Sequence, residues 1–253
     1  MDIETTAALL GVIAVGTYFQ TVTGFGLGMI VMGITSGFGL APITMVAVLI
    51  SLVTLVNSAV ALPGKLHHID WPASRAVLLG VVPSVVCGVL LLEYLSAAAA
   101  LLLEFLLGIT IIYSGIVFML RPTPLSERSS RGSFFVSGFF SGLFGGLFGM
   151  AGPPVIFHFY RQPFSLETIR NMLLLTFAFT SGVRTIFAGT QGTFTQEVWV
   201  LVAFTVPLVT LATLAGRRYP PPFSAITMRR IAFGVLIVIG GGLVFNAVSS
   251  MLR

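Results

Sequence analysis

The sequence predicts an all-α polytopic membrane protein made of two inverted repeats, each a re-entrant broken-helix hairpin plus three transmembrane helices. Three observations predict this fold class. The 253 residues are 56% hydrophobic and only 8% charged, whereas about a quarter of the residues in a soluble domain are charged. A glycine-rich segment interrupts one long apolar stretch in each half of the chain. The basic residues gather on one side if both stretches fold back on themselves. Composition therefore excludes a soluble enzyme.

The apolar runs fall into two groups of nearly equal length. The first repeat is expected at 1–122 and the second at 133–253, with a polar linker at 123–132. Short sequence echoes, such as Phe25-Gly26 with Phe148-Gly149, occur in the same order in both halves. A helix needs about 20 mostly apolar residues to cross the bilayer. We expect hairpins at 6–37 and 133–160, and spans at 41–62, 74–92, 97–120, 171–189, 198–215 and 226–249.

The stretches 6–37 and 133–160 are too long for one ordinary span and short for two. Segments 20–28 and 142–154, near their middles, are rich in glycine, and the second ends in two prolines. Glycine weakens helices, and proline lacks the backbone N–H donor. We therefore predict two half-helices that meet at a broken tip, with protein or a wet cavity satisfying the free backbone groups.

Charge placement tests this interpretation against the alternative of eight plain spans. With re-entrant hairpins, one side holds 11 of the 13 basic residues: Lys65, Arg75, Arg121, Arg128, Arg131, Arg161, Arg170, Arg217, Arg218, Arg229 and Arg230. The other side holds Asp2, Glu4, Glu93 and Glu197, and only Arg184 and Arg253 are left over. Eight spans would place Arg161, Arg170 and the arginines of 217–230 opposite the rest. The positive-inside rule favours the hairpins, with the linker in the cytoplasm and the N-terminus outside.

Two broken tips at the membrane centre would form an anion site. Each second half-helix would begin at its tip, where a helix N-terminus offers free N–H groups and a partial positive charge. The residues expected to bind substrate are Gln20, Thr21, Thr23, Gly24, Phe25, Gly26, Gly28, Asn57, Gly146, Phe148, Gly149, Gly152, Pro153 and Arg184. The alternative is that the glycines only allow close helix packing, and both roles can hold at once.

Segments 23–28 and 145–154 resemble the glycine motifs of the sulfite exporter TauE/SafE family, and the resemblance extends over essentially the whole chain. It implies a bacterial inner-membrane permease for sulfite or an organosulfonate, with a direction of transport that differs among members. Met150-Ala151 interrupt the longer glycine run that many members have at the second motif.

Three ionisable residues in or near the apolar segments each have two interpretations. Arg184 either pairs with an anionic substrate or extends outward to the membrane surface. Glu104 is either a proton-coupling carboxylate or a partly solvated residue near a helix end. His158, at the end of the second hairpin, either titrates during coupling or lies at the membrane edge.

These features predict a secondary transporter of a small sulfur-containing anion that works by alternating access. The alternatives are an anion channel and an intramembrane enzyme. No Gly-x-x-x-x-Gly-Lys-Ser/Thr signature is present, so energy would come from a gradient, with protons as the expected coupling ion, or the flux is passive. Cys87 is the single cysteine and no Cys/His metal spacing appears, so we expect no metal site. We also expect no cofactor. The basic residues lie in short loops, which argues against nucleic acid as a partner, and a homodimer is left open.

Overall fold

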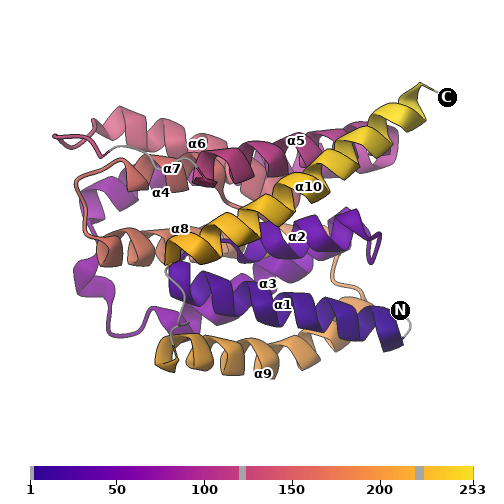
Figure 1. Cartoon of the computed structure of the whole chain (residues 1–253), viewed down its shortest axis with the longest axis horizontal. Coiled ribbons are helices and arrows are strands. Elements are labelled where there is room, and N and C mark those ends of the chain that lie inside the picture. The colour runs from indigo at the N-terminus through magenta and orange to yellow at the C-terminus, as the bar shows by residue number, and fades with distance from the viewer. Residues whose placement is uncertain (1–2, 120–123, 220–224, 253) are drawn as a thin grey trace.

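The computed structural model describes residues 3–119, 124–219 and 225–252, and its regular elements are all helical. In chain order they are α1 (Ile3–Thr23), α2 (Leu27–Gly37), α3 (Ile43–Ala61), the short 3-10 helix η1 (Leu66–His68), α4 (Trp71–Ala98), α5 (Ala100–Met119), α6 (Arg131–Phe148), α7 (Pro153–Tyr160), α8 (Leu166–Thr190), α9 (Gln196–Arg218) and α10 (Ala225–Met251). Figure 1 shows them as a bundle running along the long axis of the protein. The all-helical fold class is thereby confirmed.

Within the described residues, six helices are long and apolar enough to cross a membrane: α1, α3, α4, α8, α9 and α10. The apolar part of α5 that qualifies is shorter, at Ala100–Ile116. The helix α4 starts before the expected span because Asp70 caps it, with Oδ1 accepting from the backbone N–H of Ala73 at 2.9 Å. Such N-caps stabilise a helix start, and Pro72 is favoured in the first turn.

The two predicted breaks are present, but their arms are unequal. The first arms α1 and α6 have 21 and 18 residues, whereas the second arms α2 and α7 have 11 and 8. At 1.5 Å per residue, α1 is about 30 Å long. It is long enough to cross a membrane, whereas we expected a half-helix. Within α1, Gly16 lets α2 approach closely, since an added Cβ would lie 3.4 Å from the carbonyl oxygen of Leu27.

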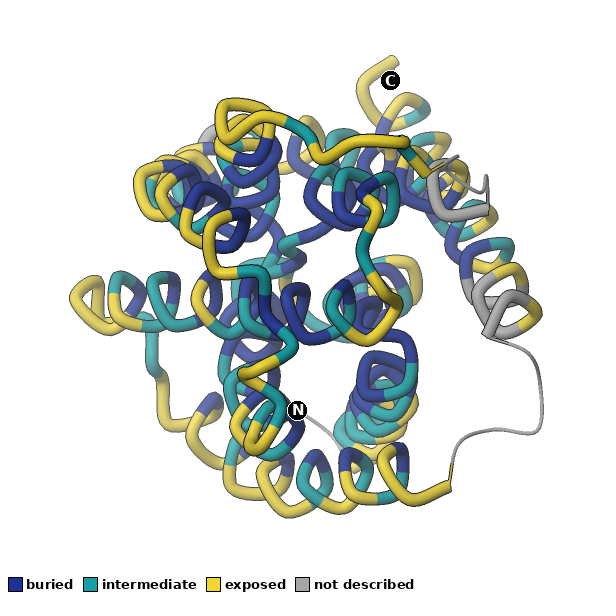
Figure 2. Tube along the Cα trace, turned by 90° about the vertical axis from the view of Figure 1, so that its left-hand side faces the viewer, coloured by how far each residue is buried: buried dark blue, intermediate teal, exposed yellow. Residues whose placement is uncertain are grey.

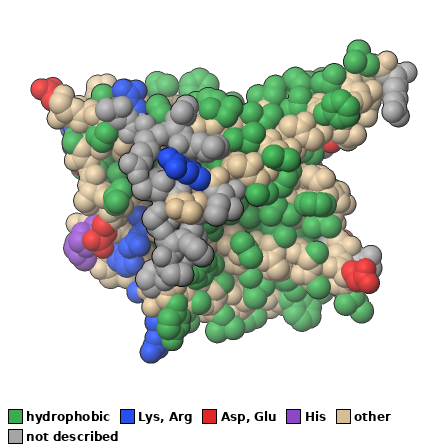
Figure 3. Space-filling model, in the orientation of Figure 1, with side chains coloured by type: hydrophobic (Ala, Val, Ile, Leu, Met, Phe, Trp, Pro, Cys, Tyr) green, Lys and Arg blue, Asp and Glu red, His purple; other side chains and the backbone are tan. Residues whose placement is uncertain are grey.

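One end of the bundle collects the loops that carry basic residues. Arg128 forms an ion pair with Asp70 at 2.8 Å, which joins the linker to the start of α4. The backbone N–H of Leu125 donates to the carbonyl of Arg161 at 2.7 Å, which joins the linker to the end of α7. On the face of the protein that Figure 3 draws, the lysine and arginine side chains lie in the left-hand half. Eight plain spans would have placed Arg161 opposite Arg128.

Helix packing pairs one half of the chain with the other. The main pairs between the halves are α4 with α6, α5 with α10, α3 with α8, α1 with α9, α3 with α9, and α4 with α8. Exchanging α1–α5 for α6–α10 in order leaves this set unchanged, which is consistent with the predicted repeat. The inverted relation of the two halves stays a prediction. Seen from the basic end, the buried residues lie on the inward sides of the helices (Figure 2).

Candidate functional site

The two broken segments meet inside the bundle. A Cβ atom added to Gly28 would lie 3.0 Å from the Cα atom of Met150 and 3.1 Å from the carbonyl oxygen of Gly149. A small pocket lies at this meeting point, lined by Gln20, Gly26, Gly28, Met29, Thr54, Gly149, Met150, Ala151, Gly152, Ile156, Phe177 and Ser181. We call it the central pocket. Its volume is about 20 Å³, enough for about one water molecule. An anion with several oxygens therefore needs the pocket to widen.

Both short arms begin at the central pocket, so their N-termini converge there. In α2 the first intrahelical bond runs from the N–H of Ile30 to the carbonyl of Gly26 at 2.9 Å. The three preceding N–H groups, at 27–29, therefore precede the helical ladder. The start of α7 is poorer in donors, because Pro153 and Pro154 have no N–H. The backbone thus supplies an anion with more donors from the first break than from the second.

Glycine is required where each break turns. Gly24 and Gly26 have φ of 90° and 109°, and Gly149 has φ of 68°. Gly149 ends α6 in the left-handed conformation, with its N–H bonded to the carbonyl of Gly145 at 3.0 Å. This arrangement is a common helix ending. An added Cβ on Gly149 would also lie 2.8 Å from the carbonyl oxygen of Ala47 in α3.

A buried amide network connects the first break to α3 and α9. The side-chain Nε2 of Gln20 donates to Oδ1 of Asn57 at 3.0 Å. Asn57 Nδ2 donates to the hydroxyls of Thr21 and Thr213 at 2.9 Å and 2.8 Å. All four side chains are at most 5% exposed. Gln20 thus belongs both to the central pocket and to this amide network.

Three further predicted residues stabilise the first break through contacts outside the central pocket. Gly24 packs on Arg170, whose Cγ would lie 2.8 Å from an added Cβ. The Thr23 hydroxyl lies 2.8 Å from the carbonyl oxygens of Phe19 and Phe25. The Phe25 ring is fully buried and stacks on Phe233, with ring centroids 5.8 Å apart. Their contacts shape the turn, and none of the three predicted residues lines the central pocket.

Arg184 is buried and stabilises the end of α6. Its Nε donates to the carbonyl of Gly146 at 3.1 Å and its Nη1 to the Ser51 hydroxyl at 3.3 Å. A cation at a helix C-terminus is favourable, because the last carbonyls lack intrahelical partners. Arg184 is only 2% exposed, so it does not extend to the membrane surface. It joins α3, α6 and α8 just behind the central pocket and is not part of its lining.

Comparison with known proteins shows the family of this chain. Residues 8–243 match the family model described as "Sulfite exporter TauE/SafE". The chain belongs to the sulfite exporter TauE/SafE family. It is 58% identical over 243 residues to a Cupriavidus necator protein named "Probable sulfite/organosulfonate exporter TauE", covering 96% of this chain and 94% of that protein. No solved structure matches this chain.

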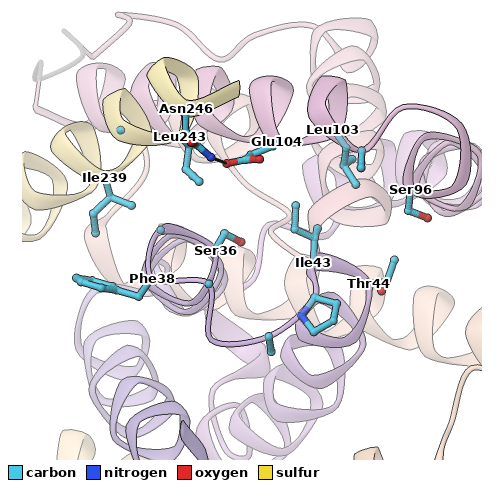
Figure 4. A pocket seen from close by; sticks show the side chains of 16 residues that line it. Ser36, Phe38, Ile43, Thr44, Ser96, Leu103, Glu104, Ile239, Leu243 and Asn246 are labelled. Carbon is cyan, nitrogen blue, oxygen red and sulfur yellow. Dashed lines mark hydrogen bonds between the residues drawn. The ribbon is translucent and has the colours of Figure 1, made fainter. Parts of the chain in front are cut away.

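In this TauE/SafE-family chain, two predicted coupling residues lie away from the central pocket. Glu104 lines a separate hollow of about 750 Å³, formed by the end of α2, the starts of α3 and α5, and α10. There its Oε1 accepts from Asn246 Nδ2 at 3.0 Å, as Figure 4 shows. His158 Nε2 lies 3.3 Å from the Ser133 hydroxyl, close to the linker. A role of either residue in coupling stays a prediction.

The remaining predicted glycine and aromatic positions divide between packing and the pocket. An added Cβ on Gly146 would lie 2.3 Å from the carbonyl of Val85, so this glycine serves the contact with α4. Phe148 and Pro153 are buried beside the second break but outside the pocket lining. Two hydroxyl residues on facing helices that line the pocket, Thr54 and Ser181, were not predicted from the sequence. A polar residue in the middle of an otherwise apolar span was the available signal.

Proposed function

We propose that this protein is a secondary membrane transporter of a small sulfur-containing anion, sulfite or an organosulfonate, which binds in the central pocket. One observation carries the proposal: the short second arms of both broken helices, α2 and α7, begin at the same buried pocket. There Gly28 packs against Gly149 and Met150. Paired broken helices with N-termini aimed at an anion are a recurrent device of secondary transporters. The name of the Cupriavidus necator relative supports the substrate class.

The chemistry of the pocket suits an oxyanion. Its lining has no ionisable side chain, so backbone N–H groups of α2, the Gln20 amide and the hydroxyls of Thr54 and Ser181 would act as donors. Anions commonly bind to such N-termini, because the N–H groups and the helix dipole act together. Neutral donors leave the site without a fixed ion pair, which favours release as well as binding.

Alternating access would explain why the central pocket is small. The pocket lies between a large hollow beside Glu104 and a smaller basic hollow beside Arg170. An anion reaches it only when packing on one side loosens. The positive-inside rule would place the basic end of the bundle in the cytoplasm of a bacterial inner membrane. Protons are the proposed coupling ion, with Glu104 and His158 as candidates.

Purified protein in proteoliposomes tests this function. We expect flux of radiolabelled sulfite or a labelled sulfonate, measured with and without a pH gradient, and an acceleration by the gradient if protons are coupled. A Gly28→Val variant should lose this flux, because its side chain would meet Met150. Gly11→Val is the matched control in the same hairpin, since nothing lies within 4 Å of its added Cβ. Flux of a cation with none of any sulfur anion would overturn the proposal.

A further inference from the structure

A second hollow lies at the basic end of the bundle, next to the first break. It has a volume of about 370 Å³ and a lining that includes Thr21, Lys65, Arg170, Leu174, Gly216 and Arg217. These residues come from α1, the loop after α3, α8 and α9. We call it the basic vestibule.

The vestibule carries an excess of positive charge. Among the described residues, no carboxylate lies within 4 Å of the side-chain nitrogens of Lys65, Arg170 or Arg217. Burial lowers the pKa of the Lys65 ammonium, and the nearby charges of Arg170 and Arg217 lower this pKa further, so both guanidinium groups repel Lys65. Glu167 offsets this effect in part, and its carboxylate lies 3.5 Å from His68 Nε2. A bound anion would relieve the repulsion.

The vestibule and the central pocket lie along the same helix faces. On α8, Arg170 and Leu174 line the vestibule, and Phe177 and Ser181 line the central pocket. Residues spaced three or four apart share one face of a helix. The α3 helix repeats this arrangement, with Ala61 in the vestibule and Thr54 in the central pocket. One path therefore leads from the basic end to the meeting point of the two breaks.

The amide network of Gln20, Asn57, Thr21 and Thr213 closes this path. Gln20 lines the central pocket, Thr21 lines the vestibule, and Asn57 bonds to both. The backbone here is tight as well, because an added Cβ on Gly216 would lie 3.0 Å from the Cβ of Thr21. These amide and hydroxyl donors can give up their hydrogen bonds to one another and donate to the oxygens of a passing anion instead. The barrier is therefore polar and reversible.

We infer that the basic vestibule is a second anion site, which binds the small oxyanion before it passes the Gln20–Asn57 amide pair into the central pocket. The inference rests on the proposed function, since it names the entrance to the same transport path. Clefts lined by one sign of charge raise the local concentration of counter-ions about 10- to 1,000-fold. The vestibule thus sets apparent affinity from the basic side, and the central pocket sets turnover.

A charge measurement that needs no transport tests the site first. Val22 lines the vestibule without carrying charge, so Val22→Cys in a Cys87→Ser background reports the local potential. We expect a negatively charged sulfonate thiol reagent to react about tenfold faster, relative to a positively charged one, than it does at exposed Ser126→Cys on the linker. Adding Arg170→Gln or salt should reduce this preference. Equal ratios at both positions would overturn the inference, whatever the protein transports.

Transport kinetics provide the second test. In proteoliposomes, Lys65→Gln with Arg170→Gln should raise the KM for sulfite presented at the basic side about tenfold, with Vmax little changed and salt dependence flattened. The matched control is Arg75→Gln with Arg131→Gln, which removes two charges from another hollow at the same end. An unchanged KM, or the same rise in the control, would overturn the inference. If the wild-type protein transports no sulfur anion, the proposed function is overturned instead.

Lipid composition separates a free oxyanion from a lipid headgroup. The flux assay is repeated in liposomes of zwitterionic phosphatidylcholine, which contain no anionic lipid. A rise in KM that persists there supports a site for the transported anion. A rise that requires anionic lipid would show that the three cations bind headgroups, and the inference would be wrong.

Discussion

At the scale of single residues, the structure divides the glycines by role. Gly28, Gly149 and Gly152 line the central pocket. Gly142 and Gly146 instead allow α6 to approach α4, where an added Cβ would meet Val81 or Val85. From the sequence alone, these two roles are both open for every glycine. Spacing alone does not separate them, because both roles need a residue without a side chain.

Gly149→Ala tests whether the second break tolerates any side chain. Gly149 and Gly192 have the same φ of 68°, so alanine costs about 1–2 kcal/mol of left-handed strain at both. Only at Gly149 would the new Cβ approach another backbone, the carbonyl of Ala47, whereas nothing lies within 4 Å at Gly192. We expect sulfite flux in proteoliposomes to be lost for Gly149→Ala and to stay near wild type for Gly192→Ala. Equal losses would attribute the effect to backbone strain alone.

Arg184→Gln distinguishes a structural arginine from a substrate ligand. The change removes the Arg184 donors to Gly146 and Ser51, and an unsatisfied buried acceptor costs about 1–3 kcal/mol. We expect a lower thermal unfolding temperature in detergent for Arg184→Gln. The smaller change Ser51→Ala should lower it less, because the Gly146 contact remains. Unchanged stability together with a raised KM for sulfite would instead place Arg184 on the substrate.

At the scale of elements, the sequence predicted the breaks better than the arms. Gly149 and Gly152-Pro153-Pro154 carry local signals for a helix end and a helix start, and α7 begins at Pro153 as those signals indicate. The unequal lengths of the arms were missed, because the glycine and proline signals mark where a helix breaks and not how deep in the membrane the break lies. The vestibule was missed because Lys65, Arg170 and Arg217 come from distant parts of the chain. In the sequence, these three residues indicate only which side of the membrane their loops face.

Close contact between α4 and α6 is expected to be a major source of stability. An added Cβ on Gly138 would lie 2.2 Å from the carbonyl oxygen of Val77, so even alanine forces the two helices apart. Overpacking of this kind costs about 1–3 kcal/mol. Gly138→Ala should lower the thermal unfolding temperature in detergent. Gly241→Ala in α10 has nothing within 4 Å and should leave it unchanged or raise it. A similar effect at both positions would contradict this packing role.

At the scale of the whole molecule, the paired packing of the two halves suits a transporter. The exchange-symmetric contacts place α3 and α8 together at the centre, and each contributes side chains to the central pocket. In the proposed alternating access, the polar contacts of Asn57 would form the gate on one side of the central pocket. Apolar packing around Leu103 and Leu243, beside the Glu104 hollow, would form the gate on the other side.

This arrangement requires that each hairpin enters and leaves the membrane on the same side. Thiol labelling can measure this. Arg128→Cys and Arg161→Cys, in a Cys87→Ser background, should react with a membrane-impermeant reagent only in inside-out vesicles. Their loops are hydrogen-bonded to one another, so they share one side, and the positive-inside rule predicts that this side is cytoplasmic. Phe38→Cys, in the exposed turn between α2 and α3, should react only in right-side-out cells. Labelling of Arg128→Cys and Arg161→Cys from opposite sides would restore eight plain spans. The central pocket would then lose its two gates, since the second break would lie in an ordinary crossing.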